Sequence, residues 1–112
     1  MTPETAVSAF GALAQDTRLS VFRMLVRAGP EGLSAGEIAA TAETSAPTMS
    51  HHLAILERSG LARSTRHGRS IRYAADYDGT RRLLAFLTED CCQGRPEICG
   101  VEIAPKSRVM AE

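Results

Sequence analysis

Three cysteines are the residues of this 112-residue chain with the clearest capacity for chemistry. Cys91, Cys92 and Cys99 all lie in the last fifth of the sequence. Their thiolates are soft ligands that select soft metals and metalloids. An odd number of cysteines argues against a disulfide framework. The cluster therefore indicates metal binding or redox sensing, unless the three residues are close by chance.

The spacing of these cysteines allows a single site if a helix ends beside them. Neighbours on a regular helix point about 100° apart, so Cys91 and Cys92 converge only where the helix frays or stops. Gly94 and Pro96 predict such a stop. The six residues between Cys92 and Cys99 are enough for a turn that returns the third sulfur.

The second chemical feature is a concentration of arginine in the middle of the chain. Residues 45–82 carry seven arginines and three acids, a net charge of +4, whereas residues 1–44 and 83–112 each carry −2. Residues 58–72 hold five arginines and no acid, namely Arg58, Arg63, Arg66, Arg69 and Arg72. A basic stripe between acidic ends is typical of a surface that binds a polyanion, and the alternative is a solvated arginine-rich surface.

Apolar periodicity and capping residues predict four helices ahead of the stripe. The first covers residues 4–14, and the second runs from Asp16 to Gly29-Pro30, with Leu19, Phe22, Leu25 and Val26 on one face. A short helix begins at Ser34 and stops near Ala42. The fourth is capped by Ser45 and ends at Gly60.

A hairpin and a last helix follow. Residues 61–65 and 70–75 read as strands, and His67-Gly68 supplies the positive φ of the turn between them. Asp78-Gly79 opens a final helix that runs to about residues 89–92. The order predicts a mainly α fold with a small β-hairpin, a winged helix-turn-helix.

The length fits one folded domain with a tail. Residues 1–92 are expected to form the DNA-binding and dimerisation domain, 91–100 the cysteine segment, and 101–112 a poorly ordered tail without periodicity. No apolar run approaches the roughly 20 residues of a membrane span. The first 15 residues lack the features of a signal peptide, so we expect a cytoplasmic protein.

The fourth helix has a face suited to reading double-stranded DNA. Met49, Leu53 and Leu56 point inward by periodicity, and His52 is expected to support the fold. The opposite side and its flanks carry Pro47, Thr48, Ser50, His51 and Ile55. Small and hydrogen-bonding side chains in the first turns can approach base edges. Arg66, His67 and Arg69 flank the hairpin tip, where they could reach phosphates or the minor groove.

These segments together resemble the ArsR/SmtB family of bacterial metal-responsive repressors. The resemblance rests on SAPTMSHHLAILERSGLARSTRHGRSIRYA, AQDTRLSVFRML and LSAGEIA, and it covers roughly residues 8–90. It implies a DNA-binding repressor rather than an enzyme. It also implies a homodimer whose interface is formed by the first and last helices. Ala6, Phe10 and Ala14 fit that interface, because the first helix has no evident partner for them.

Members of the family place their sensor ligands at different positions. Residues 33–38 contain no cysteine, so a site on the helix before the recognition helix is absent. The last helix lacks the histidine that a zinc site there would use. Cys91, Cys92 and Cys99 resemble the C-terminal three-cysteine site of arsenic-responsive members.

Ligand number and charge favour a trivalent metalloid at these cysteines. Structural zinc takes four ligands, and no fourth is evident. As(III), or Sb(III), is satisfied by three sulfurs and forms a neutral complex, whereas zinc with three thiolates is anionic. Glu89, Asp90 and Glu97 outnumber Arg95 in this segment, and together with a helix C-terminus they disfavour an anion. We therefore expect a repressor that releases its operator on binding As(III). The alternative is a thiol-redox-responsive repressor that forms a disulfide to Cys99.

Overall fold

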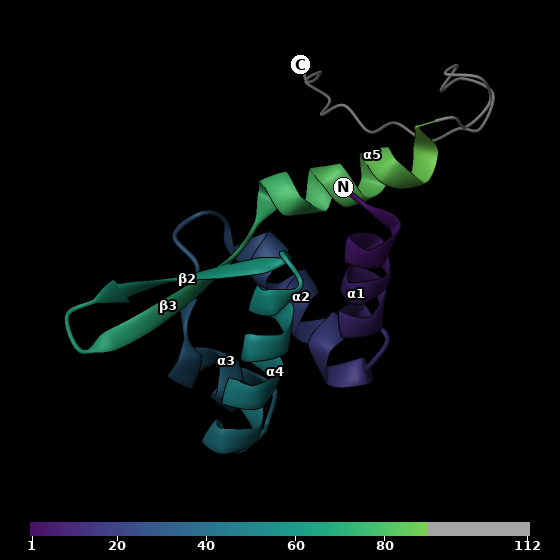
Figure 1. The fold of residues 1–112 in the computed structure, drawn as a ribbon. Coiled ribbons are helices and arrows are strands. Elements are labelled where there is room, and N and C mark those ends of the chain that lie inside the picture. The colour runs from purple at the N-terminus through teal and green to yellow at the C-terminus, as the bar shows by residue number, and fades with distance from the viewer. Residues whose placement is uncertain (90–112) are drawn as a thin grey trace.

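The computed structural model describes residues 1–89, and the cysteine segment and the tail lie outside them. The elements in chain order are α1 (Pro3–Leu13), α2 (Asp16–Ala28), β1 (Leu33–Ser34), α3 (Ala35–Thr41), α4 (Ala46–Arg58), β2 (Ala62–His67), β3 (Ser70–Ala75) and α5 (Tyr77–Thr88) (Figure 1). This order confirms the predicted mainly α winged helix-turn-helix. Within residues 1–89, no helix has both the length and the apolar character needed to cross a membrane.

The sheet is larger than the expected hairpin. It has three antiparallel strands in the order β1-β3-β2, with Leu33 opposite Tyr73 and Ser34 opposite Arg72. Arg72 secures this edge, because its Nε donates to the carbonyl of Glu31 at 3.1 Å and its Nη2 to that of Gly32 at 2.8 Å. A two-residue strand is too short to show the alternating pattern that identifies strands in a sequence.

The core is built from α2, α3, α4 and the segment that joins α4 to β2. Its largest fully buried side chains are Leu25, Ile38, Met49, Leu53, Leu56, Leu61 and Val21. The helix α1 joins this core through the alanines Ala6, Ala9 and Ala12. The prediction that Ala6 is left for the dimer interface is therefore wrong, because its side chain is already buried within its own chain, with 3% exposed. Phe10 and Ala14 are exposed as expected.

Two helix ends differ from the sequence prediction. Gln15, rather than Asp16, caps α2, accepting from the backbone N–H of Arg18 at 2.8 Å. The helix α5 begins at Tyr77 rather than at Asp78-Gly79, and its cap is Asp76, which accepts from the N–H of Gly79 at 3.0 Å. A side chain at Gly79 would collide with the carbonyl of Gly60, so this glycine lets α5 start against the end of α4. The helix α5 ends at Thr88, just before its predicted limit.

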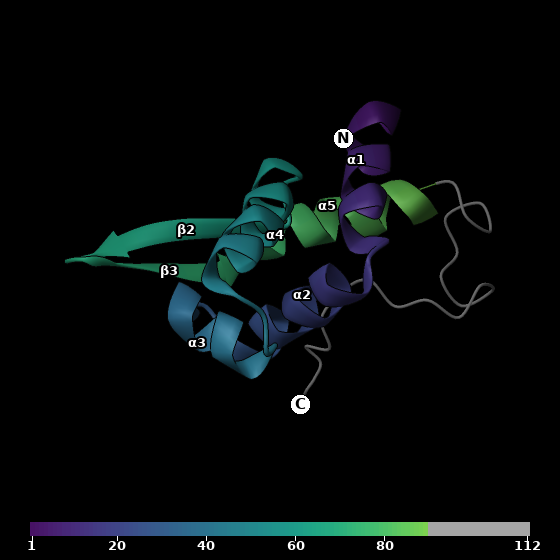
Figure 2. The ribbon, with the colours of Figure 1, turned by 90° about the horizontal axis from the view of Figure 1, so that it is seen from below.

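The tip of the β2–β3 hairpin lies at the opposite side of the molecule from α1 and the C-terminal end of α5 (Figure 1). In Figure 1, β2 and β3 project to one side, while α1 and the C-terminal end of α5 lie at the other. The view from below shows the same separation (Figure 2). A surface at the tip of the hairpin is therefore spatially distinct from a surface on α1 and the C-terminal end of α5 (Figure 1 and Figure 2).

Candidate nucleic-acid interface

The helix-turn-helix consists of α3, a short turn and α4. Ser34 caps α3 in a reciprocal arrangement: its Oγ accepts from the N–H of Glu37 at 3.1 Å, and the Glu37 carboxylate accepts from the N–H of Ser34 at 2.8 Å. The hydrogen bond from the backbone N–H of Ser34 to the carboxylate is the largest cause of a lowered pKa of Glu37. In the turn, Glu43 takes a left-handed conformation with φ +54°. The short turn places α3 beside α4, and the two helices contact each other directly.

The helix α4 divides into two faces, as the sequence predicted. Met49, Leu53 and Leu56 are buried. The four side chains expected to face DNA are all exposed: Pro47, Thr48, Ser50 and His51. Ile55 departs from the prediction, because it is half-buried against the core rather than available on the outer side. The exposed part of α4 is therefore concentrated in its first two turns.

The first turn of α4 begins with a polar cap, Ser45, which pairs with the backbone N–H of Thr48. Ser45 Oγ accepts from the N–H of Thr48 at 3.3 Å and donates to Thr48 Oγ1 at 2.9 Å. Thr48 thus keeps its own hydroxyl proton available to a partner. No acidic residue occupies this turn. The positive end of the helix dipole is consequently free to attract an anion such as a phosphate.

The β2–β3 hairpin carries the predicted cationic tip. Arg66 pairs with Ile71 and His67 with Ser70, and Gly68 makes the turn with φ +63°. Arg66, His67 and Arg69 are all exposed. Their predicted positions at the tip are confirmed, while their contact with DNA stays a prediction.

The arginine stripe separates into two kinds of residue. Arg58, Arg63, Arg66 and Arg69 are exposed, and within residues 1–89 the ion pairs are those of Asp78 with Arg81 and Arg82 on α5. The four stripe arginines therefore keep their charge available to an outside polyanion. Arg72 differs, because its guanidinium is committed to the loop before β1.

A different surface lies on α1 and α5, which contact each other. Its exposed large side chains are apolar: Val7 is 69% exposed and Leu87 53%, with Phe10 and Leu84 also open to solvent. Exposed leucine, valine and phenylalanine side chains on two helices that contact each other indicate a protein contact surface.

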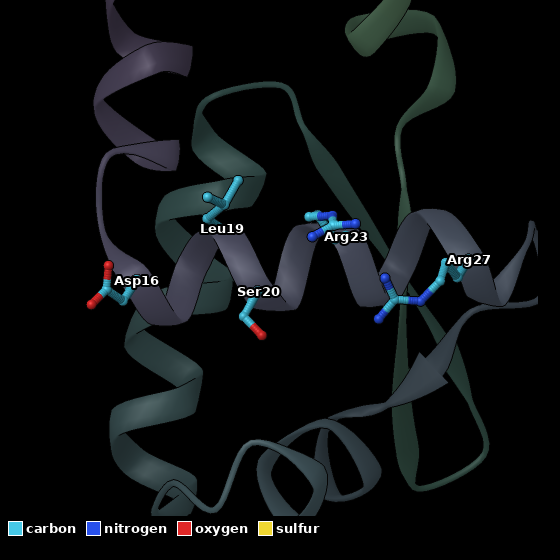
Figure 3. Close-up of a pocket in the computed structure, with 5 residues that line it drawn as sticks. All are labelled: Asp16, Leu19, Ser20, Arg23 and Arg27. Atoms are coloured by element: carbon cyan, nitrogen blue, oxygen red, sulfur yellow. The ribbon is translucent and has the colours of Figure 1, made fainter.

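The outer side of α2 is also more open than predicted. Leu19 and Val26, expected to be buried with Phe22 and Leu25, are 45% and 39% exposed. Leu19 lines a shallow hollow along this side with Asp16, Ser20, Arg23 and Arg27 (Figure 3). These residues belong neither to the exposed turns of α4 nor to the hairpin.

The predicted metalloid ligands Cys91, Cys92 and Cys99 lie outside the described residues. Among residues 1–89, no group of three histidine, cysteine, aspartate or glutamate side chains is placed to hold a metal ion. The three-cysteine site therefore stays a prediction from sequence.

Comparison with known proteins assigns this arrangement to a class. A helix-turn-helix domain model matches residues 13–65. A cadmium resistance transcriptional regulatory protein CadC homolog from Staphylococcus aureus is 32% identical over 87 residues, which are 76% of this chain and 70% of that protein. The transcriptional activator HlyU of Vibrio cholerae is 30% identical over 88 residues, 79% of each chain.

A solved structure agrees with these relatives. An ArsR-like transcriptional regulator from Rhodococcus has a TM-score of 0.71 and 26% identity, covering 87% of this chain and 89% of the other. Fold and relatives define a winged helix-turn-helix DNA-binding protein that regulates transcription and is not an enzyme. The chain belongs to the ArsR family of transcriptional regulators.

Proposed function

We propose that the protein is a homodimeric repressor that binds double-stranded operator DNA and releases it when Cys91, Cys92 and Cys99 bind As(III) or Sb(III). The observation that carries this proposal is positional. The three thiols begin two residues after Glu89, the C-cap of α5, and α5 contacts α1, the other helix that carries exposed apolar side chains. A ligand that reshapes the end of α5 would act where two subunits meet.

The dimer follows from that apolar surface. Val7, Phe10, Leu84 and Leu87 are costly to leave in water, and a second copy of the chain can bury them symmetrically. A two-fold dimer presents two α4 helices, which suits a pseudo-palindrome with half-sites about 34 Å apart. Such spacing is sensitive to small rearrangements at the interface.

The ligand follows from the chemistry of the thiols. Arsenite bears three hydroxyl groups, and three thiols replace them to give three As–S bonds and three waters. The product is neutral. The Staphylococcus aureus relative is named for cadmium resistance, but Cd(II) with three thiolates carries a negative charge. That charge is unfavourable beside Glu89, Asp90 and Glu97.

A thiol-redox repressor is the second candidate, favoured by two adjacent thiols with a third seven positions beyond the second. A peroxide would oxidise two thiols to one disulfide, yielding two waters if hydrogen peroxide is the oxidant. This candidate uses the same segment but predicts a response to peroxide rather than arsenite.

Operator release distinguishes the two candidates. A duplex is first selected from random sequence by the wild-type protein, and its release is followed with arsenite, antimonite, Cd(II), Zn(II) and hydrogen peroxide. We expect arsenite and antimonite to release it, and Cys91→Ser, Cys92→Ser and Cys99→Ser each to weaken the response to arsenite. Normal release by arsenite in all three variants contradicts the site, and release by peroxide alone favours the redox candidate.

A further inference from the structure

One guanidinium joins three helices of the DNA-binding domain. Arg18, in the first turn of α2, donates from Nε to the carbonyl of Ala12 at 2.7 Å and from Nη2 to that of Gly11 at 3.4 Å. Its Nη1 lies 3.4 Å from Nδ1 of His52 on α4. The end of α1 and the flank of α4 are thus held by the same side chain.

Each group in this contact suits its partner chemically: the carbonyls at the end of α1, the guanidinium of Arg18 and the imidazole of His52. The last carbonyls of a helix form the negative end of its dipole, so a cation is favoured beside Gly11 and Ala12. The Gly11 carbonyl also accepts from the N–H of Ala14, the C-cap of α1, at 3.3 Å. A guanidinium has only donors, arranged in a rigid fork, so it can serve two helices at once. His52 must then accept at Nδ1, which places its proton on Nε2 and leaves the ring neutral.

The surroundings of His52 favour that neutral ring. Its side chain is half-buried, and burial lowers the pKa of the imidazole, with further lowering by the charges of Arg18 and His51. A protonated His52 would have no acceptor to offer and would place a second cation beside Arg18. The hydrogen bond and the protonation state therefore support each other.

The position of His52 on α4 makes the contact relevant to DNA. His52 lies between the exposed His51 and the buried Leu53, and the two histidine rings are 6.1 Å apart at their centroids. A contact on the flank of a helix opposes rotation about the helix axis. That rotation decides where Ser50 and His51 point.

We propose that Arg18 and His52 are positioning residues for DNA recognition, which transmit the placement of the end of α1 to the rotation of α4. This inference rests on the proposed function in taking α4 as the recognition helix and α1 as part of the subunit interface. The pair touches no DNA itself. It sets the orientation of side chains that do.

Variants of the two residues test the proposal on the full-length protein. His52→Leu removes the acceptor, and Arg18→Lys keeps the charge but removes the fork. Each is expected to reduce affinity for the selected duplex roughly tenfold, within the range typical of coupling between sites. Affinity for random DNA, its salt dependence and the sedimentation mass should not change. His52→Gln, which offers a carbonyl acceptor, should recover most of the affinity.

A double variant and a matched control complete the design. If the two residues act as one unit, the double variant Arg18→Lys with His52→Leu should bind the selected duplex with the same affinity as the weaker-binding single variant. Arg23→Lys changes an arginine on the open side of α2 and should bind as wild type (Figure 3). Additive losses, equal loss on random DNA, or wild-type binding by His52→Leu would each overturn the proposal.

A spectroscopic readout separates this inference from the proposed function. In the free protein, the nitrogen resonances of His52 should show an unprotonated Nδ1 that shifts in Arg18→Lys, while His67 does not shift. If this shift is seen but the wild type prefers no duplex, the proposed function fails and the contact stands. If His52 does not respond to Arg18→Lys, the positioning role is contradicted whatever the DNA result.

Discussion

The hairpin with the first turns of α4 and the pair α1 and α5 expose opposite kinds of side chain. The first region presents cationic and small polar groups, among them Arg66, Arg69 and Ser50. The second presents large apolar groups such as Val7 and Leu87. Exposed charge costs nothing in water and attracts a polyanion over distance, whereas exposed apolar area is costly until covered. The contrast fits the proposal of two different partners, DNA at the hairpin and α4 and a second subunit at α1 and α5.

The largest expected effect comes from placing charge in the apolar region. Leu84→Asp with Leu87→Asp should convert the dimer to monomers and lower operator affinity by about 100-fold or more, because two linked half-sites become one. Sedimentation and DNA titration measure the two effects. The matched control is Leu19→Asp with Val26→Asp on α2, which should stay dimeric. If the Leu84→Asp, Leu87→Asp variant is still a dimer, α5 is not part of the subunit interface.

Neutralising the cationic tip should change the salt dependence of DNA binding. Arg66→Ala with Arg69→Ala should reduce the slope of log affinity against log salt by about 0.9 for each phosphate that is no longer neutralised. Arg81→Ala with Arg82→Ala is the control, because both arginines already pair with Asp78. An unchanged slope in the hairpin variant would exclude the tip from the DNA interface.

A smaller effect is expected from the base-reading face of α4. His51→Ala should weaken binding to the selected duplex by about tenfold, or about 1.4 kcal/mol, without altering the affinity for random DNA. His51 is exposed, so the thermal midpoint should be unaffected. Parallel losses on both DNAs would show that His51 does not discriminate sequence.

The smallest expected effect is a dependence of stability on pH through His52. Its folded pKa lies below the ordinary value of 6.5, so the unfolded chain binds more protons as the pH falls past that value. The stability that the neutral ring contributes is therefore present above pH 6.5 and lost on acidification. The urea midpoint of the wild type should fall more between about pH 7.5 and about 5.5 than that of His52→Gln. Equal falls would contradict the assignment.

The structure could be predicted from the sequence where the apolar periodicity was regular or a glycine marked a turn. The faces of α4 followed from Met49, Leu53 and Leu56, and the hairpin turn followed from Gly68. The burial of Ala6 could not be predicted, because a small side chain packs against neighbours that only the tertiary fold supplies. For the same reason, the exposure of Leu19 could not be read from its helical spacing.

Interactions between distant residues were missed for a related reason. Arg72 was counted with the DNA-facing stripe, but its bonds to Glu31 and Gly32 span about forty residues of sequence. The contact of Arg18 with His52 joins two helices whose pairing the sequence pattern does not specify. The predicted roles of Pro47, Thr48 and the three cysteines stay predictions, because their tests require DNA and metalloid.

The most direct test is to measure the reciprocal linkage between arsenite binding at the cysteines and DNA binding at α4 and the hairpin. The affinity of the dimer for arsenite is measured by calorimetry with and without a saturating selected duplex, and the affinity for the duplex is measured with and without arsenite. We predict that DNA weakens arsenite binding by the same factor by which arsenite weakens DNA binding, roughly 5- to 150-fold for a typical coupling. Equal arsenite affinity in the two states would contradict it, since the cysteine segment would then have no influence on the recognition helices.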